Sequence, residues 1–158
     1  MPAADIVELI VPTADDTVAC ALRLAPNVGA GDCILLEGNL GAGKTHFARA
    51  LIQAKLADVG VVEDVPSPTY TLVQTYQAGL LEIWHADLYR IGSEDDLVEL
   101  GLEEAFGKAL ILIEWPDRLG NVAPADALCL RFDLRESGRV LRATGPEHLV
   151  KLISMPDD

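Results

Sequence analysis

Residues 33–58, "CILLEGNLGAGKTHFARALIQAKLAD", carry the clearest fold signal in this sequence. Its beginning, residues 33–37, is a short apolar run, which is typical of a buried central strand. Residues 44–58 have helical spacing, with Phe47 and Leu51 on one face. Glycines separate the two segments. The stretch therefore predicts a buried strand, a glycine-rich turn and a helix, in that order.

The glycine-rich turn matches the P-loop pattern G-x-x-x-x-G-K-[ST] over residues 38–45. Glycines let the backbone adopt turns that are closed to residues with a Cβ atom, so its N–H groups point inward at phosphates. The following helix adds its positive N-terminal end, Lys44 adds a full charge for the β- and γ-phosphates, and the Thr45 hydroxyl ligates Mg²⁺. We therefore expect an ATP site made of Gly38, Asn39, Leu40, Gly41, Ala42, Gly43, Lys44, Thr45 and His46.

Two carboxylates are candidates for the metal position, because a P-loop protein needs such a group near the end of a buried strand. Glu114 ends "ALILIE", and Asp87 ends "LLEIWHAD". Each has an alternative role, Glu114 as an ordinary strand-end carboxylate and Asp87 as a helix cap or loop residue. Thr69 lies in "SPTYT", residues 67–71. It contacts the metal or the γ-phosphate if this segment is a switch loop, and otherwise it belongs to a turn that leads into a strand.

The rest of the chain alternates strands with helices. We expect strands over 5–11, 33–37 and 109–115, a hairpin from 70–76 and 80–86, and a second hairpin from 127–134 and 139–145. We expect helices over 13–25, with Thr13 as N-cap, and over 145–154, and one helix or two short ones from 94. The predicted fold is a single α/β domain, 1–158, with a P-loop NTPase-like sheet that is mainly parallel, antiparallel hairpin additions, and helices on both faces.

The 158 residues carry a formal net charge of −13, so the surface repels phosphate backbones. Direct binding of DNA or tRNA is therefore not expected. No segment reaches the roughly 20 apolar residues of a membrane span, and the N-terminus lacks the features of a signal peptide, so we expect a cytoplasmic protein. The cysteines have no metal-ligand spacing, and His85 and His148 are interpreted as structural. The acidic segment 93–104 and the arginines between 131 and 142 are either solvated faces or docking surfaces.

Three classes of P-loop protein are compatible with this size. A regulatory GTPase should carry N-K-x-D, and no asparagine here is followed by lysine. A small-metabolite kinase normally needs an arginine-bearing lid, and residues 88–130 hold only Arg90 and Arg118. The third class is an ATPase that works on a protein partner.

The motifs "GNLGAGKTHFAR" (38–49), "SPTYTLVQTY" (67–76), "WHADLYR" (84–90) and "LILIEWPDRLG" (110–120) occur in this order and at these distances. In this combination the sequence closely resembles the TsaE family over nearly its whole length. These are bacterial P-loop ATPases required for the tRNA modification threonylcarbamoyladenosine.

The resemblance implies roles for particular residues. Thr45 and Glu114 match the family's magnesium positions, Thr69 its switch-like loop, and Asp87 its essential aspartate. The expected catalytic residues are Lys44, Thr69, Asp87 and Glu114. Regions near the base and ribose are matched by Thr13, Ala14, Gly138 and Arg139. The family often has an acidic residue at the position of Asn39 and a second threonine at the position of His46. The sequence departs from the family at both positions.

The resemblance also implies a function. The chain is expected to be the ATPase subunit that acts with the TsaD–TsaB complex in forming threonylcarbamoyladenosine at adenosine 37 of tRNAs that read codons starting with A. It would meet tRNA only through that complex. ATP and Mg²⁺ are the expected cofactors. Hydrolysis by the isolated chain is expected to be slow, because no arginine is well placed in the sequence to act in cis. A small-metabolite kinase remains the alternative.

Overall fold

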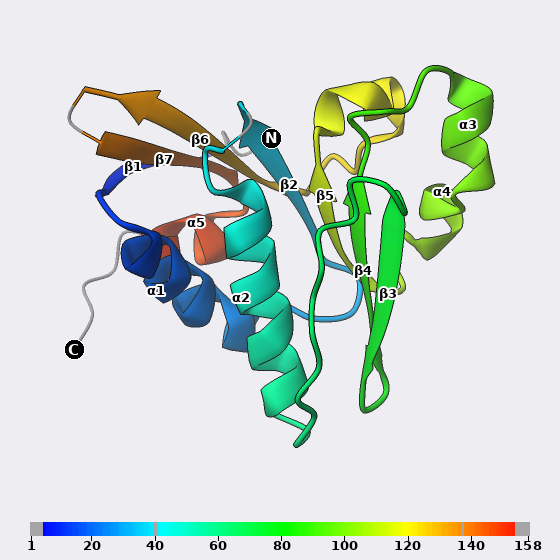
Figure 1. Cartoon of the computed structure of the whole chain (residues 1–158), viewed down its shortest axis with the longest axis horizontal. Helices are drawn as coiled ribbons and strands as arrows, with labels where there is room; N and C mark the ends of the chain where they lie inside the picture. Colours follow the sequence, from blue (N-terminus) through cyan, green and yellow to red (C-terminus); the bar gives the residue numbers. More distant parts are fainter. Residues whose placement is uncertain (1–4, 40, 137, 154–158) are drawn as a thin grey trace.

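The computed structural model describes residues 5–39, 41–136 and 138–153 (Figure 1). Within these residues, seven strands form one sheet in the order β1-β7-β6-β2-β5-β4-β3. The strands are β1 (Asp5–Val11), β2 (Cys33–Gly38), β3 (Val73–Ala78), β4 (Leu81–Asp87), β5 (Leu110–Glu114), β6 (Leu128–Arg135) and β7 (Gly138–Gly145).

The centre of the sheet is parallel. Strand β2 pairs in parallel with both β5 and β6, and β5 pairs in parallel with β4. The β6–β7 hairpin and β1 extend one side antiparallel, and β3 extends the other side antiparallel to β4. The predicted α/β architecture, a parallel sheet with antiparallel hairpin additions, is confirmed.

Helices cover the sheet on both faces (Figure 1). One face carries α1 (Ala14–Leu24), α2 (Lys44–Ala57) and α5 (Glu147–Ile153), and the other carries α3 (Glu94–Glu99), α4 (Leu102–Ala105) and the 3₁₀ segment η2 (Pro116–Val122). A further 3₁₀ turn, η1 (Ala25–Asn27), follows α1. Strand β5 is buried from both sides, because alternate residues of a strand point to opposite faces. Its Leu110 and Leu112 join the core under α1 and α2, whereas Ile111 and Ile113 join the core under α3 and α4.

The helix boundaries follow local signals in the sequence. Thr13 is the N-cap of α1, where its side chain accepts from the Asp16 N–H and the Asp16 carboxylate accepts from the Thr13 N–H. This capping box satisfies amide groups that the first turn leaves free. The acidic segment forms two short helices, α3 and α4, because Gly101 between them has a φ of 77°.

The first hairpin begins later than predicted. The sequence pattern places its first strand from Tyr70, but β3 starts at Val73. The N–H of Leu72 donates to the Pro68 carbonyl at 2.7 Å, and Leu72 has a φ of 69°, in the left-handed region. The backbone therefore turns over residues 68–72, and side-chain alternation gives no signal of that reversal.

Three parallel strands end side by side at one edge of the sheet. The register pairs Glu114, the last residue of β5, with Leu36 of β2 and with Asp87 of β4. The P-loop leaves β2 two residues after Leu36. This topology alone brings the two predicted carboxylates next to the glycine-rich turn, as expected at the carboxyl ends of parallel strands.

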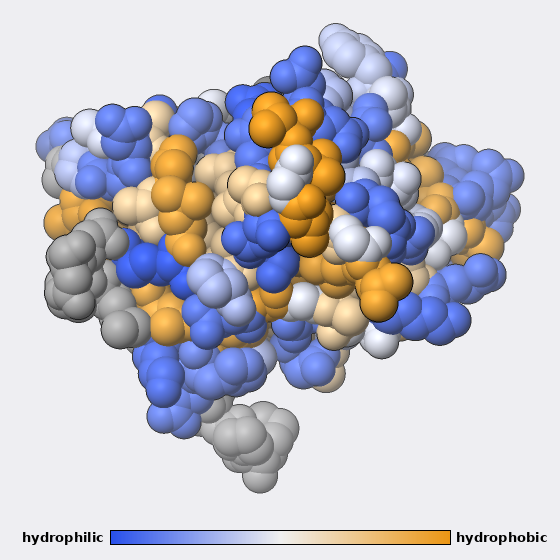
Figure 2. All heavy atoms as spheres, turned by 90° about the horizontal axis from the view of Figure 1, so that it is seen from below, coloured by the Kyte–Doolittle hydropathy of each residue, from blue (hydrophilic) through white to orange (hydrophobic). Residues whose placement is uncertain are grey.

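The opposite end of the molecule carries exposed apolar groups. Figure 2 views this end from below, and apolar side chains gather there among polar ones. The exposed residues near the end of α2 and at the β3–β4 turn include Val59, Val62 and Leu80. In the part of the chain that the structure describes, no helix is long and apolar enough to cross a membrane.

Candidate nucleotide-binding site

The P-loop follows β2 and ends at the first turn of α2. Gly38 has a φ of 138°, and a Cβ atom placed there would lie 2.4 Å from the Phe132 carbonyl oxygen. Gly43, the N-cap of α2, has a φ of 115°. Only glycine adopts these conformations without strain, so the sequence pattern is required by the backbone at both positions. Leu40, one of the predicted site residues, lies outside the described residues.

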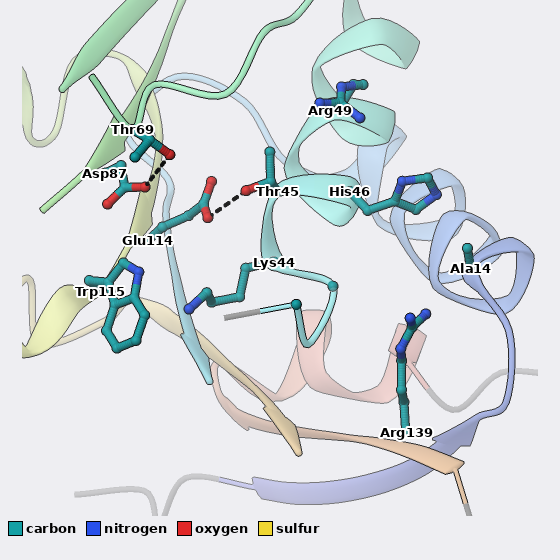
Figure 3. A pocket seen from close by; sticks show the side chains of 12 residues that line it. Ala14, Lys44, Thr45, His46, Arg49, Thr69, Asp87, Glu114, Trp115 and Arg139 are labelled. Carbon is teal, nitrogen blue, oxygen red and sulfur yellow. Dashed lines mark hydrogen bonds between the residues drawn. The ribbon is translucent and has the colours of Figure 1, made fainter. Parts of the chain in front are cut away.

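Lys44 is almost fully buried at the base of the P-loop. Its Nζ donates to the Gly38 carbonyl and lies 3.6 Å from the centre of the Trp115 ring (Figure 3). Burial lowers the pKa of Lys44 below its ordinary value, and the nearby Glu114 and Asp87 carboxylates oppose this effect. The ammonium group is therefore held against the loop and the indole by a hydrogen bond and a cation–π contact.

Thr45 and Glu114 form the second contact of the site. The Thr45 hydroxyl donates to Glu114 Oε1 at 2.7 Å (Figure 3). Glu114 is 2 % exposed and occupies the end of β5, as the sequence predicted. Its other oxygen, Oε2, lies 2.7 Å from Nε2 of His85, a fully buried residue of β4. Both oxygens of this carboxylate therefore have defined partners.

Asp87, the last residue of β4, connects the end of this strand to the segment at 67–71. Its Oδ2 accepts from the Thr69 hydroxyl at 3.3 Å, and its Oδ1 accepts from the Tyr89 N–H at 3.0 Å. The Ser67 and Thr69 hydroxyls lie 2.7 Å apart. The loop that carries Thr69 is thus hydrogen-bonded to a buried carboxylate next to the P-loop.

These groups line one cavity of about 350 Å³. Its lining residues are Ala14, Gly41, Gly43, Lys44, Thr45, His46, Arg49, Thr69, Asp87, Glu114, Trp115 and Arg139. Figure 3 shows that the carboxylates lie on one side of Lys44, and that His46, Arg49 and Arg139 lie on the other. The cavity therefore has an acidic end, suited to a metal ion, and a basic end, suited to phosphate or another anion.

Some predicted site residues lie beside the cavity rather than in its lining. Gly38 and Asn39 line a neighbouring depression with Trp115 and Pro116. Ala42 is buried within the loop. The Thr13 side chain is engaged in the α1 capping box, and Gly138 begins β7, next to Arg139. Ser137, between the two strands of the predicted second hairpin, lies outside the described residues.

Arg49 is a site residue that the sequence reasoning missed. It follows Thr45 by four residues on α2, so both side chains lie on one face of the helix. Its Nε donates to the Val65 carbonyl at 2.9 Å, which ties α2 to the segment before the 67–71 loop. Arg49 and Arg139 both line the cavity, so two arginines of this chain lie beside the site. That no arginine of this chain acts in cis on hydrolysis stays a prediction. Helical spacing from Thr45 was the signal that would have identified Arg49.

This molecule is a P-loop nucleotide-binding α/β protein. It has the strand, glycine-rich loop and helix of that class, with a buried lysine and a threonine–glutamate pair at the carboxyl ends of the strands. The family model described as "Threonylcarbamoyl adenosine biosynthesis protein TsaE" matches residues 11–142. The chain belongs to the TsaE family.

Individual relatives agree with the family match. The chain is 42 % identical over 133 residues to a Rickettsia felis protein named "tRNA threonylcarbamoyladenosine biosynthesis protein TsaE". The matched region is 84 % of this chain and 76 % of the relative. A Bacillus subtilis protein of the same name is 36 % identical over 115 residues, 72 % of this chain and 69 % of the relative. The crystal structure of Bacillus subtilis YdiB superposes with a TM-score of 0.73 at 23 % identity and covers 97 % of this chain and 94 % of that one, a likeness of fold.

Proposed function

We propose that this chain is a Mg²⁺-dependent ATPase that acts with TsaD and TsaB in forming threonylcarbamoyladenosine at adenosine 37 of tRNA. The observation that carries the proposal is the Thr45–Glu114 pair beside Lys44, at the mouth of a P-loop, in a member of the TsaE family. The family supplies the biological process, and the cavity supplies the chemistry.

The chain's own groups would hold the triphosphate in three ways. The N–H groups of the P-loop and the N-terminus of α2 would face phosphate oxygens, as in other proteins with this loop. Lys44 would exchange its contacts with Gly38 and Trp115 for contacts with the phosphates. Arg49 and Arg139, at the basic end of the cavity, would bind further oxygens of the nucleotide.

The Thr45 hydroxyl and the Glu114 carboxylate fit a magnesium ion. Both are hard oxygen donors, and they lie 2.7 Å apart in the structure. Two adjacent ligands of an octahedral ion with bonds of about 2.0–2.1 Å lie about 2.9 Å apart, so little movement is required. When bound, the ion neutralises charge on the phosphate oxygens during transfer. Asp87, next to Glu114 at the strand edge, is available to position the attacking water.

Partner dependence would act through the 67–71 loop. Thr69 links this loop to Asp87, so a change in the loop reaches a carboxylate of the site directly. Tyr70 of the same loop is 83 % exposed and accessible to a partner. A protein that docks there would order the loop and raise the rate. The net charge of −13 fits a chain that meets tRNA only through its partners, in the cytoplasm where tRNA is modified.

The small-metabolite kinase is the less supported alternative. Such an enzyme normally closes an arginine-bearing lid over the phosphates. Arg90 lies over the Tyr70 ring at 5.2 Å, and Arg118 donates to the Tyr89 carbonyl. Neither of these described residues lines the cavity.

Phosphate release measured with and without TsaD and TsaB tests the proposal. We expect slow hydrolysis by the isolated chain, which ceases without Mg²⁺, and a rise of about 10-fold or more with both partners, since an ordered switch or an added arginine is worth up to about 10³–10⁵ in related systems. A chain that turns over rapidly alone once a small acceptor is supplied, and does not respond to the partners, would support the kinase instead.

A further inference from the structure

His85 is a buried histidine that the sequence pattern did not place in the site. It lies two residues before Asp87 on β4, so both side chains point to the same face of the sheet. It is 0 % exposed, and its Nε2 lies 2.7 Å from Glu114 Oε2. The opposite oxygen of that carboxylate, Oε1, accepts from the Thr45 hydroxyl at 2.7 Å. Glu114 is thus held from two sides.

The hydrogen bonds of the ring assign its tautomer. An ionised carboxylate only accepts, so Nε2 must be the donor in the contact with Glu114. The ring's Nδ1 is buried and has no hydrogen-bond partner among the described residues. A proton on Nδ1 would leave a buried N–H unpaired beside an otherwise satisfied ring, which is unfavourable. The arrangement therefore corresponds to an imidazole ring that carries a proton on Nε2.

We propose that His85 is a positioning residue for the metal site: its Nε2–H fixes the Glu114 carboxylate so that Oε1 faces Thr45. The inference rests on the proposed function, because it assigns Thr45 and Glu114 to a magnesium ion. A carboxylate on a flexible side chain otherwise rotates and loses the alignment of its oxygens. Groups that orient metal ligands in this way are typically worth about 10- to 100-fold in metal affinity or activity.

Substitutions that differ only in the reach of the donor test this role. His85→Gln places an amide nitrogen near the position of Nε2, whereas the shorter His85→Asn reaches only as far as Nδ1. We expect His85→Asn to raise the Mg²⁺ concentration for half-maximal binding of a fluorescent, non-hydrolysable ATP analogue by about 10-fold or more, and His85→Gln to restore most of this loss. Binding of the analogue without Mg²⁺ should change by about twofold or less in both variants, because the P-loop contacts are kept.

A merely structural role predicts another pattern. In that case both variants would lower the melting temperature and leave the Mg²⁺ dependence at the wild-type value, and this result would overturn the inference. Failure of the proposed function is distinguishable, because the wild-type protein itself would then bind the analogue with no response to Mg²⁺.

The wild-type protein provides a second readout that needs no substitution. Long-range ¹H–¹⁵N NMR correlations of histidine rings distinguish a proton on Nε2 from a proton on Nδ1. We expect a proton on Nε2 of the ring that is protected from solvent, with the signal assigned by its loss in His85→Gln. A neutral ring with its proton on Nδ1 would overturn the inference, since that tautomer has no proton to donate to Glu114.

Discussion

Glu114 illustrates how single residues shape this site. Thr45 and His85 each bond one of its oxygens, and Asp87 is its neighbour across the parallel strands. Glu114 and Asp87 are both buried and both lie beside Lys44, yet their contacts differ. Glu114 faces the P-loop threonine, whereas Asp87 faces the loop that carries Thr69. We therefore expect removal of Glu114 and removal of Asp87 to have different effects on nucleotide binding and hydrolysis.

Substitution of each carboxylate should separate chemistry from loop control. Glu114→Ala is expected to lower Mg²⁺-dependent hydrolysis by about 100-fold or more and to weaken nucleotide binding less, because metal-assisted charge stabilisation is worth several kcal/mol. Asp87→Ala should also lose turnover but keep nucleotide binding. Fluorescent-nucleotide titration alongside phosphate release, both with TsaD and TsaB present, measures the two effects.

Asp87→Asn is the matched control for this comparison, because it keeps an acceptor for the Tyr89 N–H. If Asp87 were only a structural cap, Asp87→Asn would hydrolyse ATP at the wild-type rate with partners present. We expect it to remain as impaired as Asp87→Ala, because the proposed role needs the carboxylate.

The buried thiol of Cys33 makes the stability depend on alkaline pH. Burial, with smaller effects of Cys129, Asp126 and Asp32, raises the pKa of Cys33 from 9.0 to about 12. The unfolded chain releases this proton above pH 9 while the folded chain retains it, so the stabilisation is complete below pH 9 and is lost as the pH rises towards 12. The free energy of unfolding should fall by about 1.4 kcal/mol per pH unit in this window from this group alone.

Urea unfolding at pH 8 and pH 10.5 measures this effect. Between these values the wild-type protein should lose about 2 kcal/mol more than Cys33→Ala, which lacks the thiol. Equal losses in the two proteins would contradict the buried position of Cys33 in β2.

At the scale of elements, the P-loop depends on how β2 packs against β6. Gly38 is the last residue of β2 and pairs with Phe132 of β6. A Cβ atom at Gly38 would meet the backbone oxygen of Phe132 at 2.4 Å, and the φ of 138° disfavours any other residue. Both the pairing of β2 with β6 and the backbone of the P-loop therefore require glycine at position 38.

Gly38→Ala should lower the free energy of unfolding by about 3 kcal/mol, the upper part of the range for a residue held in a conformation that only glycine adopts readily. Gly29→Ala is the matched control. At Gly29 an added Cβ atom has no heavy atom within 4 Å among those described, and its φ is unstrained. Chemical denaturation of both variants decides the prediction, which fails if the two proteins are equally stable.

Elements were largely predictable from the sequence because local signals determine them. The capping box at Thr13 and the apolar run of β5 each carry their own information in a few residues. The start of β3 was not predictable from a local signal, because the reversal at Leu72 depends on a left-handed backbone conformation that no sequence pattern requires. The partner of His85 depends on which strand lies beside β4, and a pattern read along one strand does not contain that information.

The whole molecule combines an acidic surface with a site at one edge of its sheet. The carboxylates of the 93–104 segment lie on and around α3 and α4, on the face opposite α1 and α2. Together with the net charge of −13, this surface disfavours direct contact with the phosphate backbone of nucleic acid. In the proposed function, ATP hydrolysis at the P-loop would therefore affect tRNA only through the partner proteins.

The content of threonylcarbamoyladenosine in bulk tRNA tests this account most directly. It should be measured by mass spectrometry of digested nucleosides, in host cells depleted of the protein and supplied with either the wild type or Lys44→Ala at equal abundance. We expect the wild type to restore the modification and Lys44→Ala to leave it at the depleted level, because Lys44 is the charge that faces the phosphates in the proposed site. Restoration by Lys44→Ala to the wild-type level, or a modification that is unchanged by depletion, would contradict the account.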